Sequence, residues 1–194
     1  MNARDTILQA LRTNRPSPEQ YPLPPVVTLG DLDAGVERFV ASLRILGGDV
    51  MERQGDETLD AAIARRFPDA RNVCSAVPET NGTMRAETLK TPQDAKDVDI
   101  AVVRAAFGIA ETGSIFLSEK QLPLNSLAHL AQHIVIVLSP DDITANMHTA
   151  YQSRPEFHSA NYGVLMSGPS ATADIQGVLI RGAQGVRSLS VWFA

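Results

Sequence analysis

Short apolar runs alternate with amphipathic segments along most of this chain. Between residues 32 and 43, apolar side chains recur at steps of three and four, which is typical of a helix that buries one face. Residues 57–67 repeat the pattern, and a helix is also predicted from Ser139 to about Tyr151. The amphipathic segments therefore predict several helices, each with one face against a common core.

The apolar runs between these segments are short and predict strands. They cover residues 49–51, 72–77, 97–103, 115–117, 134–138, 162–166, 177–180 and 188–193. Because helices and strands alternate, the pattern favours an α/β domain layered as α/β/α around a mostly parallel sheet. Such sheets bind ligands beyond the carboxyl ends of their strands, so we expect a site at that edge.

Residues 1–28 differ in character from the rest of the chain. Residues 5–12 have the pattern of a short amphipathic helix, and residues 14–30 are rich in proline. We therefore divide the chain into an N-terminal helix with a proline-rich arm, 1–28, and an α/β domain, 29–194. Such an arm suits docking on its own domain or on a neighbouring subunit, so a homo-oligomer is one possible assembly.

The composition narrows the classes of partner and location. The 194 residues carry a net charge of −5 with no block of basic residues, which argues against a nucleic-acid partner. The apolar runs are too short to span a bilayer, and the first residues lack the apolar region of a signal peptide. We expect a cytoplasmic protein. The single cysteine, Cys74, excludes an internal disulfide and an iron–sulfur cluster ligated by this chain alone, so we expect no cofactor.

A polar turn follows the predicted strand at residues 162–166. It is Ser167-Gly168-Pro169-Ser170, and Thr172 and Asp174 come directly after it. If a helix begins here, free backbone N–H groups gather at the turn and form a cradle for an anion. Capping of a strand-to-helix turn without any ligand explains the same residue types and is the simpler interpretation of the motif alone.

A second turn places a carboxylate, a hydroxyl and a glycine between apolar runs. Glu111 is a candidate general base or nucleophile, and Thr112 and Gly113 are candidate ligand contacts. The alternative is that Glu111 and Thr112 stabilise the turn itself. His129 and His133 are four residues apart, but no third ligand accompanies them, so we expect structural histidines and no metal site.

Three motifs, in this order and spacing, resemble the LUD-domain family. They are Ile109–Leu117, His133–Val137 and Ser167–Ile175. The resemblance runs from about residue 29 to the C-terminus. Within the family, the chain is most similar to the small type of member that has no iron–sulfur cluster. The resemblance implies a fold similar to ribose-5-phosphate isomerase, glucosamine-phosphate deaminase and CoA-transferases. It also implies a part in oxidising L-lactate to pyruvate, beside two larger iron–sulfur partner proteins.

One stretch departs from the family pattern. The family commonly has Gly-Val-His-Gly-Pro near the C-terminus, where this chain has Gly182-Ala-Gln184-Gly-Val186. Because Gln184 does not titrate near neutral pH, an acid–base or metal-ligand role at this position is not expected.

Three functions remain open from the sequence. The first is an accessory subunit of a lactate-oxidation system, which binds a small anionic or nucleotide-like ligand at the two turns. The second is an independent isomerase- or transferase-type enzyme that acts on a phosphorylated or CoA-linked molecule, with Glu111 as base or nucleophile. The third is an interaction module that holds a partner with its N-terminal arm.

Overall fold

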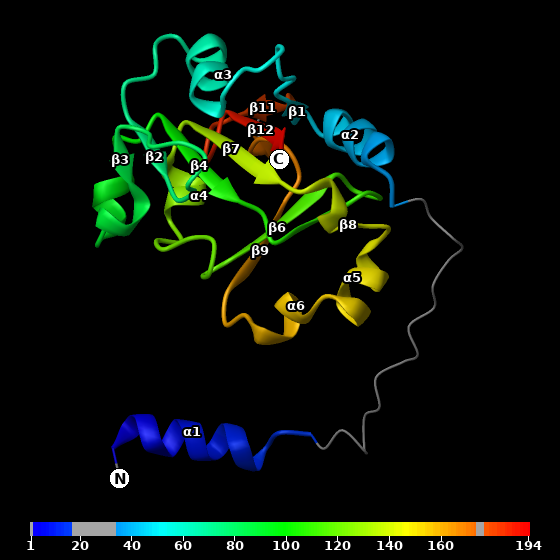
Figure 1. Ribbon diagram of the computed structural model, residues 1–194. Helices are drawn as coiled ribbons and strands as arrows, with labels where there is room; N and C mark the ends of the chain where they lie inside the picture. The colour runs from blue at the N-terminus through cyan, green and yellow to red at the C-terminus, as the bar shows by residue number, and fades with distance from the viewer. Residues whose placement is uncertain (1, 17–33, 174–176) are drawn as a thin grey trace.

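A six-stranded parallel sheet forms the centre of the computed structural model, which describes residues 2–16, 34–173 and 177–194. The strand order is β1-β12-β7-β4-β2-β3, and every neighbouring pair is parallel. Figure 1 shows the sheet with helices on both sides. The prediction of an α/β/α architecture with a mostly parallel sheet is confirmed.

The strands are short, as the apolar runs predict. The central sheet contains β1 (Asp49–Val50), β2 (Val73–Ser75), β3 (Met84–Arg85), β4 (Ile100–Arg104), β7 (His133–Leu138) and β12 (Ser188–Phe193). A second, four-stranded sheet has the order β8-β5-β6-β9, and its strands are β5 (Phe107–Ile109), β6 (Ser114–Ser118), β8 (Ile143–Thr144) and β9 (Gly163–Met166). β10 (Ala171–Thr172) and β11 (Ile180–Arg181) form a separate antiparallel ribbon.

Helices begin at side-chain caps where the sequence supplies them. The α-helices are α1 (Ala3–Thr13), α2 (Val36–Ile45), α3 (Leu59–Arg66), α4 (Leu127–Leu130), α5 (Met147–Ser153) and α6 (Pro155–Ser159), and short 3-10 helices cover Ala86–Thr88, Pro92–Ala95 and Pro140–Asp142. The Thr58 hydroxyl caps α3, and the Asn2 side chain caps α1. No residue of α1 is buried.

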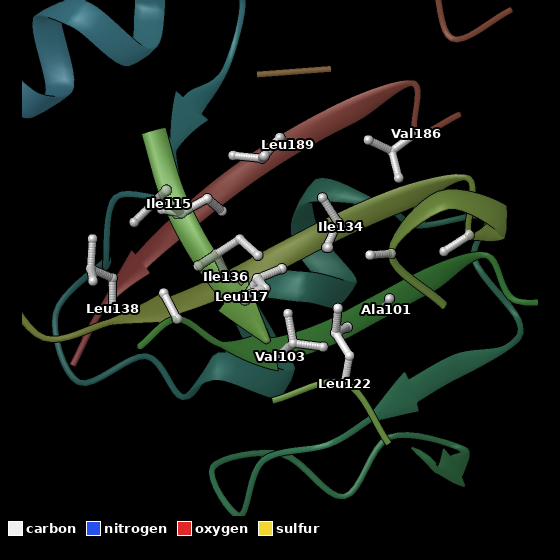
Figure 2. Packing of buried hydrophobic residues seen from close by; sticks show 14 of the residues in the cluster. Ala101, Val103, Ile115, Leu117, Leu122, Ile134, Ile136, Leu138, Val186 and Leu189 are labelled. Carbon is white, nitrogen blue, oxygen red and sulfur yellow. The ribbon is translucent and has the colours of Figure 1, made fainter. Parts of the chain in front are cut away.

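The core is divided between the two faces of the central sheet. One face packs against α3 through a cluster that includes Val102, Val135 and Trp192. The other face packs against α2, α4 and the second sheet, and Figure 2 shows Ile115 and Leu117 of β6 beside Ile134 and Ile136 of β7. Because alternate residues of a strand point to opposite faces, Phe107 and Phe116 reach the far side of the second sheet. There they pack with Phe157 of α6.

Two helix predictions are wrong. The predicted helix from Ser139 instead begins at Met147, because Ile143 and Thr144 pair with β5 and Asn146 caps α5 through the Thr149 amide at 2.8 Å. Residues 171–172, where we expected a helix to start, form β10 and pair with β11. In the predicted strand at 177–180, only the last residue lies in a strand. The start of the helix predicted from residue 32, where either Asp31 or Asp33 could serve as the N-cap, lies outside the described residues.

Within the described residues, no helix combines the length and the apolar character needed to cross a bilayer.

Candidate functional site

The two sequence motifs meet through three hydroxyl groups. Thr112 Oγ1 lies 2.6 Å from Ser114 Oγ, and Ser114 Oγ is hydrogen-bonded to Ser167 Oγ. The pairing of β6 with β9 places Ile115 opposite Met166, which brings the residues next to them together. We call Thr112, Ser114 and Ser167 the hydroxyl cluster. The structure thus joins two turns that are more than fifty residues apart along the chain.

Both glycines of the motifs pack directly against the C-terminal part of α2 and the residues that follow it. Gly113 has a φ of 61°, and a Cβ placed on it would lie 2.2 Å from the Leu43 backbone nitrogen. Gly168 has a φ of 81°, and its Cβ would lie 2.4 Å from the Leu46 carbonyl oxygen. These two positions need glycine because protein backbone passes close to them.

Ser170 belongs to a different neighbourhood from Ser167. Its amide donates to the Val186 carbonyl at 3.0 Å, and its carbonyl accepts from the Gly182 amide at 2.7 Å. A Cβ on Gly185 would lie 2.9 Å from the Ser170 Cβ, so Ser170 packs against the loop at residues 182–187. Thr172 lies in β10, and Asp174 lies outside the described residues.

The anion cradle expected at this turn rested on a helix N-terminus, and that premise is wrong. Residues 171–172 pair as a strand with Ile180 and Arg181, and the Ser170 amide already has a carbonyl partner. Any ligand at this turn must therefore use the hydroxyl groups and the remaining polar atoms.

Glu111 comes directly before Thr112 of the hydroxyl cluster, and its carboxylate is bonded to the start of α5. Its side chain is exposed, and Oε2 accepts from the Met147 amide at 3.3 Å, where α5 begins. A carboxylate at a helix N-terminus is stabilised by the free amides and the dipole of the helix. This contact gives Glu111 a role in positioning α5, and its role as a base or nucleophile stays a prediction.

His129 and His133 lie within hydrogen-bonding distance of hydroxyl groups of the fold, and the cysteine is buried. His129 Nε2 lies 3.3 Å from the Tyr162 hydroxyl, and His133 Nδ1 lies 2.7 Å from the Ser188 hydroxyl. Over the described ranges, His, Cys, Asp and Glu side chains do not gather into a group that fits a metal ion. Cys74 is buried in β2, and desolvation raises the pKa of its thiol to about 11.

The carboxyl edge of the central sheet, where we expected a ligand, holds protein side chains. At the end of β2, the Ser75 hydroxyl lies 2.9 Å from both the Val77 and the Thr80 carbonyl oxygens and can donate to either, and Arg85 Nη1 donates to the Val77 carbonyl at 2.7 Å. Arg104 at the end of β4 forms an ion pair with Glu79. These bonds fix the loop after β2 over this edge.

The opposite, amino edge of the sheet contains a cavity of about 300 Å³. It lies where β4, β7 and β12 begin and where α3 ends, and it is lined by Arg66, Phe67, Asp99, Gln132, His133 and Arg187 among others. Of these residues only His133 belonged to a sequence motif. The others come from separate segments that converge because β4, β7 and β12 are neighbours in parallel register. We call this space the basic cavity.

Comparison with known proteins gives a family and a fold. The model of the LUD domain family matches residues 40–193. A crystal structure of a DUF162 family protein from Deinococcus radiodurans is similar, with a TM-score of 0.61 and 18% sequence identity over 81% of this chain and 94% of that chain. At this identity the structural likeness shows the fold alone. No curated protein matches this chain.

Proposed function

This chain belongs to the LUD-domain family, and we propose that it is the accessory subunit, without an iron–sulfur cluster, of a system that oxidises L-lactate to pyruvate. The family is associated with lactate utilisation, which supports a role of this chain in that process. In this proposal the chain binds a small anionic or nucleotide-like ligand and acts beside two iron–sulfur partner proteins, which carry the electrons.

The chemistry of Cys74 is the observation that carries this proposal. A cluster is typically held by about four thiolates, and this chain has one cysteine. That cysteine is buried in a central strand, and its raised pKa keeps it a neutral thiol at physiological pH. Its side chain is therefore a small apolar part of the core, and electron transfer is left to the partners.

The predicted ligand-binding residues remain part of this proposal. They are Thr112, Gly113, Ser167, Gly168, Ser170, Thr172 and Asp174. Support comes from the hydroxyl cluster, where Ser114 Oγ links the hydroxyl groups of Thr112 and Ser167 from the two motifs. A hydroxyl both donates and accepts, so a ligand with an oxyanion or a hydroxyl group can replace one of these mutual bonds.

Reconstitution tests the accessory role. The rate of lactate-dependent reduction of an artificial acceptor is measured anaerobically with the two iron–sulfur proteins, with and without this chain. We expect no turnover by this chain alone, a lower rate when it is omitted, and co-elution with at least one partner. Lactate oxidation by the isolated chain, or an unchanged rate and no co-elution, would contradict the proposal.

The alternative is an independent enzyme in which Glu111 is the base or nucleophile. The position of Glu111 beside the hydroxyl cluster favours this alternative. The exposure of the carboxylate and its bond to the first turn of α5 do not favour it. Sugar phosphates and acyl-CoA esters are screened for turnover with the wild type, Glu111→Gln and the control Glu37→Gln. Turnover that only Glu111→Gln abolishes supports the enzyme, and turnover that it leaves unchanged removes Glu111 from the mechanism.

A further inference from the structure

The basic cavity is formed by the starts of neighbouring parallel strands. Ser188 of β12 lies opposite His133 of β7, which in turn lies opposite Ile100 of β4. Arg187 comes one residue before β12, and its amide donates to the Gln132 carbonyl at 2.7 Å, which fixes its position beside β7. The cavity is therefore built on the paired strands of the central sheet, and it is open to solvent.

The positive charge of Arg187 at this cavity has no bonded counter-charge in the described part of the chain. The Arg187 guanidinium has no hydrogen-bond or ion-pair partner within residues 2–16, 34–173 and 177–194. Arg66, at the end of α3, contacts Asp49 through a single nitrogen, Nη2, at 3.2 Å. Both guanidinium groups therefore retain N–H donors that can form charge-assisted hydrogen bonds.

His133 adds a third group that faces this space. Its ring lies against the Phe67 ring, with 4.7 Å between the centroids, and Nδ1 lies 2.7 Å from the Ser188 hydroxyl. Burial lowers the pKa of His133, and the positive charges of Arg187 and Arg66 lower it further, while the carboxylate of Asp99 acts in the opposite direction. An anion bound between His133 and these arginines would relieve this repulsion.

Two carboxylates, Asp69 and Asp99, line the cavity beside the two arginines, and that of Asp99 already holds backbone amides. Asp99 Oδ2 accepts from the Arg71 and Asn72 amides at 2.8 and 2.9 Å, which lowers the pKa of this carboxyl. Asp69 also lines the cavity, and its side chain is exposed. The carboxylate of Asp99 thus holds the backbone before β2 and leaves the arginines available.

We propose that the basic cavity binds the carboxylate or phosphate group of a small molecule, through Arg187, His133 and Arg66. This site is separate from the hydroxyl cluster and does not depend on a role in lactate oxidation. A volume of about 300 Å³ is at the lower end for small-molecule sites, so the ligand is a compact metabolite and not a dinucleotide.

Titration with simple anions tests this site. Inorganic phosphate and L-lactate are titrated separately into the full-length protein, with calorimetry for affinity and the imidazole NMR signals for location. The variants are Arg187→Gln, the charge-conserving Arg187→Lys and the control Arg181→Gln, which removes the same charge from β11 without lining the cavity. Thermal unfolding confirms that each variant is folded.

The expected result is saturable binding of at least one anion with a shift of the His133 signals and a rise in the pKa of His133. Loss of one charge-assisted contact in Arg187→Gln should weaken binding about tenfold or more, while Arg187→Lys and Arg181→Gln bind like the wild type or slightly less well. The anion that binds more tightly shows whether the site prefers a phosphate or a carboxylate group. No saturable binding of either anion, or equal weakening in Arg181→Gln, would overturn the proposal.

Discussion

The hydroxyl cluster and the basic cavity differ in what fills them. At the hydroxyl cluster, the protein satisfies its own polar groups, and the glycines beside it allow backbone to pack against backbone. At the basic cavity, the Arg187 guanidinium has no bonded partner in the described part of the chain, and the space is open to solvent. The comparison teaches that a motif which identifies a family can hold the fold together, while the charge without a bonded partner lies elsewhere.

Replacing Gly113 should give the largest effect on stability. In Gly113→Ala, the new Cβ would lie 2.2 Å from the Leu43 nitrogen in a backbone with a φ of 61°. We expect a loss of about 3 kcal/mol or more in the free energy of unfolding, measured by urea denaturation. The matched control is Gly55→Ala, which has a φ of 56° and nothing within 4 Å of the new Cβ. It should cost about 1 kcal/mol from the backbone alone.

Equal losses in these two variants would show that the packing against α2 does not matter. The hydroxyl cluster would then be no more constrained than an exposed turn, and the contrast with the basic cavity would fail.

Removing one hydroxyl from the cluster should have an intermediate effect. Ser167→Ala leaves the buried Ser114 hydroxyl without one of its two partners, which should cost about 1–2 kcal/mol of unfolding free energy. Ser170→Ala is the control, because the Ser170 hydroxyl has no hydrogen bond to the described residues, and it should stay within about 0.5 kcal/mol of the wild type. Similar stability of the two variants, measured by denaturant titration, would mean that the cluster contributes little to the fold.

The smallest expected effect is a dependence of stability on pH at the basic cavity. Burial, followed by the charge of Arg187, lowers the pKa of His133 in the folded state, so the unfolded chain binds the proton more readily. The contribution of neutral His133 to the free energy of unfolding is therefore fully present above the unfolded-state pKa of about 6.5, and it is lost as the pH falls through the lower pKa of the folded state. The free energy of unfolding of wild type and His133→Gln is compared between pH 7.5 and about pH 5. Parallel curves of unfolding free energy against pH for the two proteins would show that the surroundings of His133 do not lower its pKa.

Apolar runs predicted the central sheet well because its strands are buried on both faces. Residues 134–138 are continuously apolar and residues 188–193 are mostly so, with Ser188 and Ser190 as the exceptions, and they lie in β7 and β12 in the middle of the sheet. The strands β5 and β8 were missed, because residues 107–109 and 143–144 are too short to signal strands until they pair with each other. In the same way, Ser170 and Thr172 are typical of both helix caps and turns, and only the pairing with β11 decides between them.

The candidate site was predictable only in part. Order and spacing of motifs identified Thr112 and Ser167, which the structure brings together through Ser114. The basic cavity could not be predicted, because Arg66 and Arg187 are more than a hundred residues apart and neither belongs to a motif. Their proximity follows from strand order, which a single sequence does not reveal.

The strand order also determines when this domain can complete its sheet. β1 is an edge strand whose single neighbour in the sheet is β12, at the other end of the domain in sequence. During synthesis, β1 emerges from the ribosome early and waits for almost the whole domain before its partner exists. Residues 49–50 thus lack a strand partner until the end of the domain has been made, and contacts of such large separation slow folding. A chaperone that acts on the nascent chain would find its earliest unpaired strand there.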